Sequence, residues 1–273
     1  MNAVFWIAKN TFLEAVRQKF FNFLLLLGLV MTAVSVGITG FNFGSSELKF
    51  IADFGFGGLF LFGSILAVVM SVQLFFAEID NRTAITLLAK PVNRRAFILG
   101  KFFGVWALLG VFTLIMTGLL ALVLALRQPA LAQVALARGM PEPFLSLSGL
   151  GIFALLQWLR LGIVAAMTVA FTSFSQTYLY AVIVSFCGLL IAQLQYILQD
   201  VAGSAKSSLI VKCGAEALTK LLPNLQLFNL GPQLTLNAQG VPAGTIAEIF
   251  GYGSVWIVVL LLVTVWCFRH REM

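Results

Sequence analysis

The sequence predicts an all-α integral membrane protein with one transmembrane domain, residues 1–273, that contains six membrane-spanning helices. Hydrophobic residues make up 60% of the chain and charged residues only 10%, and the mean hydropathy is +1.01. A chain of this composition has lipid rather than water as its main solvent. Apolar runs long enough to cross about 30 Å of hydrocarbon as helices alternate with more polar segments. The predicted spans are 20–39, 55–76, 102–126, 149–171, 178–198 and 248–268.

Residues 1–19 precede the first span and are amphipathic. One helical face contains Phe5, Ala8, Phe12, Val16 and Phe20. The opposite face carries Lys9, Asn10, Glu14 and Arg17. Apolar residues on one side and charged residues on the other are typical of a helix that lies in the membrane interface. We therefore expect an N-terminal interfacial helix.

A cleaved signal peptide is an alternative interpretation of the N-terminal region. Ala33-Val34-Ser35 is compatible with a cleavage site. However, the apolar run 20–39 is longer than the usual hydrophobic region of a signal peptide, and it can span the bilayer. We interpret this run as the first span.

Three predicted loops lie on the external side of the membrane. The first precedes the second span, which opens with the glycine-rich residues 54–58. The second covers 127–148, where Pro129, Pro141 and Pro143 argue against a long helix. The third and longest is 199–247, whose apolar part is expected to form a re-entrant or interfacial piece.

The distribution of Lys and Arg predicts which ends of the spans face the cytosol. Of 17 such residues, the predicted cytosolic segments hold Lys9, Arg17, Lys19, Arg82, Lys90, Arg94, Arg95, Lys101, Arg269 and Arg271. The longer external loops hold fewer. Because positive charge gathers on the cytosolic side of a membrane, both termini are expected inside the cell. The predicted location is the cell (inner) membrane.

The segment 77–101 is strongly charged although long apolar runs flank it on both sides. Such a segment cannot lie in hydrocarbon, so it is expected to form a cytosolic loop. Asp80 or Asn81 can cap a short helix that starts at Arg82, and Pro91 ends that helix because it lacks an N–H donor. The result is a small helix held flat between two spans. This shape suits docking to a soluble partner.

The order of residues in this segment carries a resemblance to a known family. The residues are Glu78, Arg82-Thr83, Leu87-Leu88, Pro91-Val92, Arg94 and Gly100-Lys101. In this order they resemble the cytosolic loop of type-2 ABC transporter permeases, and most of all the subgroup that includes the permease of the nitrous oxide reductase copper-maturation system. The resemblance covers residues 76–104. Many members have Gly before the Thr, whereas this chain has Arg82. A weaker similarity follows in Leu222-Pro223-Asn224-Leu225 and Phe228-Asn229-Leu230.

The resemblance implies that segment 77–101 contains a coupling helix, which docks into a separate ABC ATP-binding subunit. The docking residues would be Glu78, Arg82, Thr83, Leu87, Leu88, Pro91 and Arg94. The charged residues would form ion pairs with the partner, and Thr83, Leu87 and Leu88 would enter its cleft. A second permease copy or a paralogue would complete the pathway, as a homo- or heterodimer. ATP and Mg²⁺ would bind the partner subunit, and this chain would bind no cofactor.

Several kinds of chemistry lack the residues that they need. There is no GxxxxGK[ST] motif, since the residue five positions before Gly100 is Arg95 and Phe102 follows Lys101. One histidine and three cysteines without a CxxC pair give little material for a metal site or a catalytic pair. The acidic residues fall at span edges or in loops, which argues against coupling to an ion gradient. The basic residues flank the membrane, so no nucleic-acid partner is expected.

Arg160 is the one charged residue near the middle of a predicted span. A charge at that depth costs about 2.5–3.5 kcal/mol, so the side chain should face protein or water rather than lipid. Gln157 lies three residues earlier on the same helical face. One hypothesis is that both residues line a translocation path and meet an anionic group. The alternative is a structural arginine that snorkels or binds backbone carbonyls.

Two functions fit these features. The first is the membrane-spanning permease of an ATP-driven ABC transporter, an exporter, with ATP hydrolysed by a separate subunit. The second is a membrane anchor that relays the motion of an ATPase to an external enzyme or assembly complex without transport. A polar lining around Gln157 and Arg160 would favour transport. A membrane enzyme ranks third, since the chain offers no set of nucleophile, base and orienting residue.

Overall fold

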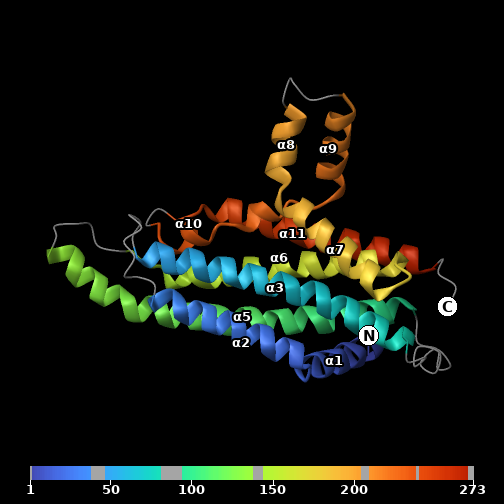
Figure 1. Ribbon diagram of the computed structural model, residues 1–273, viewed down its shortest axis with the longest axis horizontal. Helices are drawn as coiled ribbons and strands as arrows, with labels where there is room; N and C mark the ends of the chain where they lie inside the picture. The colour runs from blue at the N-terminus through green and yellow to red at the C-terminus, as the bar shows by residue number, and fades with distance from the viewer. Residues whose placement is uncertain are drawn as a thin grey trace.

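The computed structural model describes residues 2–37, 47–80, 94–137, 144–203, 209–237 and 240–269, and all regular secondary structure in these ranges is helical. The helices form an elongated bundle (Figure 1). In chain order they are α1 (Asn2–Val16), α2 (Lys19–Gly37), α3 (Glu47–Asp80), α5 (Arg94–Ala137), α6 (Leu147–Phe174), α7 (Tyr178–Gln193), α8 (Gln195–Gly203), α9 (Leu209–Leu221), the 3₁₀ turn η2 (Leu225–Phe228), α10 (Gly231–Thr235) and α11 (Ala243–Arg269).

The length and apolar composition of these helices establish a multi-pass membrane protein. Helices α3, α5, α6 and α11 are each long and apolar enough to cross a membrane. The pair α1–α2, bent by 63°, is a fifth candidate. Helix α7 is apolar but has 16 residues, a length of about 24 Å against about 30 Å of hydrocarbon. The predicted all-helical membrane class is therefore confirmed, with four or five helices of spanning length among the described residues.

Helix α3 begins at Glu47 and not at Gly55 as predicted for the second span. The early start is explained by Leu48, Ile51 and Ala52, which are buried and extend the helical core-facing stripe upstream. The glycines that follow are part of the helix. A Cβ atom on Gly55 would lie 2.6 Å from Leu120 Cδ1. The glycine here permits close packing against α5 rather than flexibility.

Helix α5 is longer than predicted because it continues through Pro129 to Ala137. The expectation that residues 127–148 form a loop is thus wrong for its first half. Proline removes one backbone hydrogen bond and bends a helix. Figure 1 shows α5 curving over its last turns. Leu131 still packs against the main hydrophobic core beyond the proline, and this contact supports the extra helical turns.

Helix α6 is the centre of the bundle and α7 lies at its edge. Helix α6 contacts α3, α5, α7, α10 and α11. Helix α7 ends at Gln193 and not at Leu198 as predicted for the fifth span. The break coincides with a tertiary contact: the buried Gln195 side chain turns inward and donates from Nε2 to the Leu222 carbonyl oxygen, at 2.6 Å.

The chain leaves the bundle after α7 and returns to it before α11. Helices α8 and α9 pack on each other and project sideways (Figure 1). The following stretch then lies along the bundle, where Leu222, Leu225, Phe228 and Leu234 are buried. The predicted external segment 199–247 is therefore two different pieces, a projecting helical hairpin and a stretch packed on α3 and α6.

Helix α1 packs against the first turns of α5. A Cβ atom on Gly104 would lie 2.6 Å from Thr11 Cβ and 2.8 Å from the Ala8 carbonyl oxygen, so glycine lets the two helices approach closely. Thr11 and Ala15 are buried in this contact. Phe5, placed on the apolar face by sequence, is 65% exposed.

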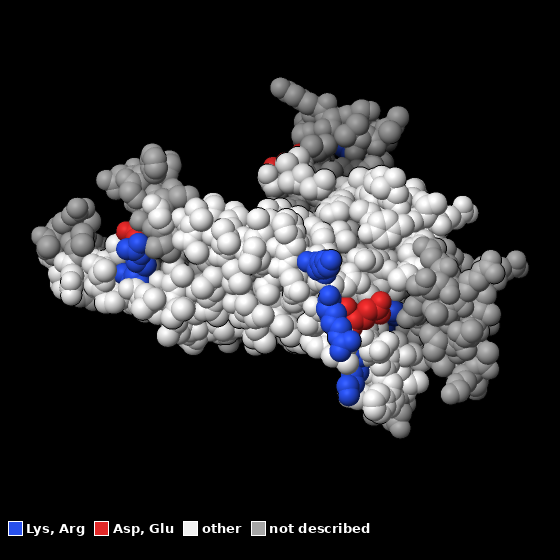
Figure 2. All heavy atoms as spheres, turned by 60° about the horizontal axis from the view of Figure 1, so that its bottom comes forward, with Lys and Arg blue, Asp and Glu red and all other residues white. Residues whose placement is uncertain are grey.

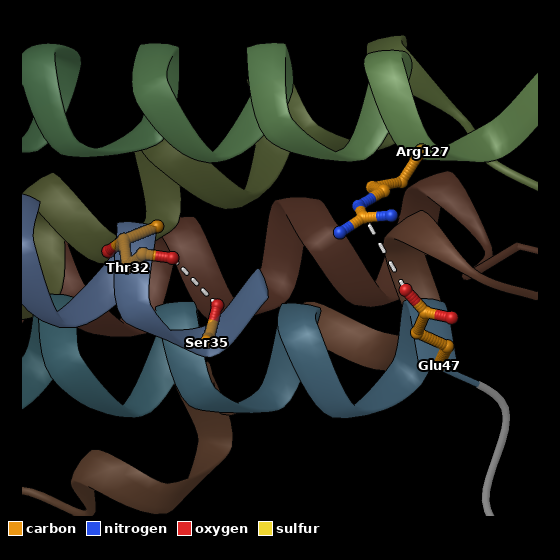
Figure 3. Close-up of polar contacts among 4 residues, drawn as sticks. All are labelled: Thr32, Ser35, Glu47 and Arg127. Carbon is orange, nitrogen blue, oxygen red and sulfur yellow. Dashed lines mark hydrogen bonds and ion pairs between the residues drawn. The ribbon is translucent and has the colours of Figure 1, made fainter. Parts of the chain in front are cut away.

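Charged side chains form two groups on the face seen in Figure 2, with a broad uncharged surface between them. Arg127 of α5 and Glu47 of α3 form an ion pair, with Nε and Oε1 4.0 Å apart (Figure 3). In the same view, Ser35 of α2 donates to the Thr32 carbonyl oxygen of its own helix, at 2.7 Å. An uncharged band between charged ends is typical of a protein surface that crosses a bilayer.

Candidate functional site

The predicted docking segment lies between the end of α3 and the start of α5. Its residues Arg82, Thr83, Leu87, Leu88 and Pro91 are outside the described residues. Glu78 and Arg94 lie on the helical backbones of α3 and α5, while their side chains are not described. The structure thus defines the base from which the loop starts and to which it returns.

Aromatic contacts hold this base together. The ring centroids of Phe75 on α3 and Phe97 on α5 are 6.0 Å apart, and Ile98 and Val169 are buried with them. This small cluster fixes the loop-flanking ends of α3 and α5 to α6.

The same base also touches the first residues of α7. The ring of Phe76 packs edge-on against Tyr178, with centroids 6.2 Å apart. Val72, Phe76 and Ala181 form a buried cluster between α3 and α7. Helix α7 therefore begins at the base of the predicted docking loop.

The last residue of α7 meets Arg160 in the middle of α6. Arg160 is only 3% exposed and lies about 20 Å from either end of its helix. Its Nη2 atom donates to Gln193 Oε1 at 2.7 Å, and Nη1 donates to Gln157 Oε1 at 3.5 Å. The guanidinium carbon lies 3.6 Å from the ring centroid of Phe60 on α3, a cation–π contact.

This cluster, which we call the Arg160 site, consists of Arg160, Gln157, Gln193 and Phe60. Two of its buried donors, Arg160 Nε and Gln157 Nε2, have no hydrogen-bond partner. No carboxylate among the described residues contacts the guanidinium, whose neighbours are two amides and one ring. A buried charge without a counter-ion is costly in protein.

Comparison with known families identifies the chain. A model of the ABC-2 family transporter proteins matches residues 5–273, which is nearly the whole chain. The chain belongs to the ABC-2 transporter family. A comparison with curated proteins found no match.

Membership assigns the general role of the chain. ABC-2 proteins are the membrane components of ABC transporters and lack the ATPase site, and they work with an ATP-binding subunit. The predicted type-2 ABC permease is thus confirmed at the level of the family. Within the described ranges, no three His, Cys, Asp or Glu side chains come together as a group that could hold a metal ion.

On the side of α6 away from α7, this ABC-2 permease has a tight contact with α5. Trp106 and Trp158 stack with centroids 4.4 Å apart and an interplanar angle of 13°. Each indole donates from Nε1 to the other residue's carbonyl oxygen, at 3.2 Å from Trp106 and 2.9 Å from Trp158. The pair fixes α5 and α6 to each other immediately behind the Arg160 site.

Sequence reasoning found part of the Arg160 site of the permease. The three-residue spacing placed Gln157 beside Arg160, and the structure shows that contact. Gln193 is one of three glutamines, with Gln195 and Gln199, near the outer end of the predicted fifth span, and this position gave no reason to pair it with Arg160. Phe60 gave no signal among 26 phenylalanines. Both reach Arg160 from other helices, and such tertiary pairing cannot be read from helical periodicity.

Proposed function

We propose that this chain is the permease half of an ATP-driven exporter. Two such halves, either identical or paralogous, form the pathway, and two ATP-binding subunits hydrolyse ATP bound with Mg²⁺. The family match over residues 5–273 carries this proposal. The order of residues from Glu78 to Lys101 supports the finer assignment to the subgroup that resembles the nitrous oxide reductase copper-maturation permease.

The proposed topology has six crossings of the inner membrane, an interfacial α1 and both termini in the cytosol. The start of α1 and the end of α11 lie at the same end of the bundle (Figure 1), which supports an even number of crossings. Helix α7 and the packed stretch after α9 together make the fifth crossing. The bias of Lys and Arg toward the predicted cytosolic segments supports the orientation.

Helix α7 supplies a route from the ATPase to the membrane interior. Closure of the ATP-binding subunits moves the coupling helix, and the packed base of Phe75, Phe97, Phe76 and Tyr178 passes this movement to α7. Because α7 ends at the Arg160 site, its displacement stretches the bond between Gln193 and Arg160. The two arrangements of α7 are the two states between which ATP drives the permease.

Of the two candidate functions, transport fits the interior of the chain better than a relay of ATPase motion to an external complex does. A relay needs only a sealed apolar bundle, whereas the Arg160 site places a charge and two amides inside the helices. Outward transport predicts that the transported molecule accumulates inside inside-out vesicles when ATP is added.

Co-purification with a matched pair of charge reversals tests the docking role. Arg82→Glu reverses a charge in the predicted coupling helix, and Arg138→Glu makes the same change in a predicted external loop. Bringing like charges together at an interface costs several kcal/mol. We therefore expect Arg82→Glu to reduce the co-purified ATP-binding subunit at least about tenfold. Arg138→Glu should co-purify normally. Equal recovery with both variants would contradict the docking assignment.

A further inference from the structure

The Arg160 site has more hydrogen-bond donors than acceptors. A guanidinium offers five N–H donors, and Arg160 makes two hydrogen bonds, both to neutral amide oxygens. Its Nε atom is buried and unpaired, as is Gln157 Nε2. Both unpaired groups are donors, and the site has a net positive charge. The partner that the Arg160 site lacks is therefore a negatively charged hydrogen-bond acceptor.

The geometry of the site favours an oxyanion as the missing partner. A guanidinium is planar and pairs with carboxylate or phosphate through two parallel hydrogen bonds in its own plane. The ring of Phe60 covers one face of the guanidinium at 3.6 Å, so the edge of the group is the side left for a ligand. A water molecule could accept hydrogen bonds from these donors but would leave the charge without a counter-ion.

The wall of the site on the α7 side is the end of a helix, which is anchored two residues further on by the hydrogen bond from Gln195 Nε2 to the Leu222 carbonyl oxygen. Gln193 is the last residue of α7, and the chain turns away from the bundle at Leu194, which is 42% exposed. Helix α7 contacts α3, α6 and η2, while Leu190 on its outer side is 58% exposed. Movement of this helix end would separate Gln193 from Arg160 and admit a ligand at the guanidinium edge.

We propose that the Arg160 site binds a carboxylate or phosphate group of the molecule that this permease transports, with Arg160 and Gln157 donating and Gln193 acting as the displaceable partner. This inference rests on the proposed transport function. The oxyanion has two sources, the headgroup of an anionic lipid-like molecule in the bilayer or a small soluble anion.

Thermal unfolding of the purified full-length chain in a neutral detergent tests the proposal. A ligand that binds the folded state raises the unfolding temperature as its concentration rises. The lipid source is probed with dioleoylphosphatidylglycerol, with zwitterionic dioleoylphosphatidylcholine as comparison, and the soluble source with inorganic phosphate and succinate. We expect a saturable increase with one anionic probe and none with phosphatidylcholine. No increase with any anionic probe would overturn the proposal.

Two arginine substitutions show whether the effect belongs to this site. Arg160→Gln removes the buried charge, whereas Arg127→Gln makes the same change at a 38% exposed arginine paired with Glu47. The response to the anionic probe should disappear in Arg160→Gln and persist in Arg127→Gln. An equal response in both variants would show that the anion binds elsewhere.

Gln157→Glu provides a second test that does not depend on Arg160→Gln folding. The new carboxylate would stand where Gln157 Oε1 now lies, 3.5 Å from Arg160 Nη1, and would supply the missing negative acceptor. We expect a higher unfolding temperature without ligand and no further increase with the anionic probe. A full response of Gln157→Glu would contradict the proposal.

The outcome is separable from that of the docking test. Anion binding is measured on this chain alone and without nucleotide, whereas the docking test measures recovery of a second subunit. If the ATP-binding subunit docks normally but no anion response is seen, only the proposal of anion binding at the Arg160 site is contradicted. An anion response in a chain that recovers no ATP-binding partner would support the Arg160 site as an anion site but contradict the proposed transporter function.

Discussion

Helices α6 and α7 are neighbours with very different surroundings. In α6, 20 of 28 residues are buried, and they lie on all sides of the helix. In α7, five of 16 are buried, and these five form a single stripe: Ala181, Ser185, Gly188, Leu189 and Ala192. A helix packed all round cannot shift without disturbing its neighbours, whereas one held by a stripe can. The contrast separates a fixed centre from a movable edge.

The contacts at the two sides of α6 follow the same division. Toward α5, two stacked indoles and their reciprocal hydrogen bonds hold α6 in place. Toward α7, the polar link at mid-helix is the hydrogen bond between Arg160 and Gln193. A ligand that competes for Arg160 would thus act on the movable side. The fixed side would keep its geometry throughout the transport cycle.

The largest expected difference between the fixed and movable sides is in the destabilisation caused by two glycine substitutions, one on α6 and one on α7. A Cβ atom on Gly162 of α6 would lie 2.5 Å from Trp106 Nε1, and one on Gly188 of α7 would lie 2.6 Å from Phe171 Cε2. Trp106 is held by its stack and hydrogen bonds, while the partly exposed Phe171 ring can rotate away. We expect Gly162→Ala to cost about 2–3 kcal/mol and Gly188→Ala less than about 1 kcal/mol.

Thermal or denaturant unfolding of both variants measures this difference. Gly251→Ala on α11, where a Cβ atom meets nothing within 4 Å, is the control for replacing a helical glycine. It should unfold at or above the wild-type temperature, since alanine favours helix over glycine. Equal destabilisation by Gly162→Ala and Gly188→Ala would remove the contrast between the two helices.

The sequence predicted the helical membrane class because apolar runs dominate its composition, and it placed Arg160 beside Gln157 because one helical turn relates them. It did not predict the end of α7. The break at Gln193 coincides with Gln195 reaching Leu222, a contact between residues 27 positions apart. Likewise, the sequence shows glycines at 55, 57 and 58 but not that the Leu120 side chain packs directly against Gly55. Periodicity within one helix cannot reveal which neighbour it meets.

Hydrogen exchange tests the movable side directly. Gln193→Leu keeps a similar size but removes the acceptor for Arg160 Nη2. Loss of a hydrogen bond to a charged group costs about 1.5–3 kcal/mol. Amide exchange in the second half of α7 should therefore become about 10–100-fold faster, since each factor of ten corresponds to about 1.4 kcal/mol. Exchange in α6 should not change.

Gln199→Leu on α8 is the matched control, because Gln199 is exposed and lies beyond the end of α7. It should leave exchange in both helices at the wild-type rate. Unchanged α7 exchange in Gln193→Leu would mean that the bond to Arg160 does not hold the helix end, and ligand entry by this route would lose its basis.

The smallest expected effect comes from the other arginine pair. Arg127 and Glu47 are 4.0 Å apart, with side chains 38% and 25% exposed. Although Glu47 Oε1 itself is buried, water around the exposed part of Arg127 screens the attraction. Arg127→Gln should change the free energy of unfolding by less than about 0.5 kcal/mol, and high salt should reduce the difference further. Unfolding of both proteins at low and high salt measures this. A large, salt-independent loss would mean that Arg127 is effectively buried at the end of α3. Arg127, which is paired with a carboxylate, and Arg160, which is not, would then both be buried, and the contrast drawn between them would not hold.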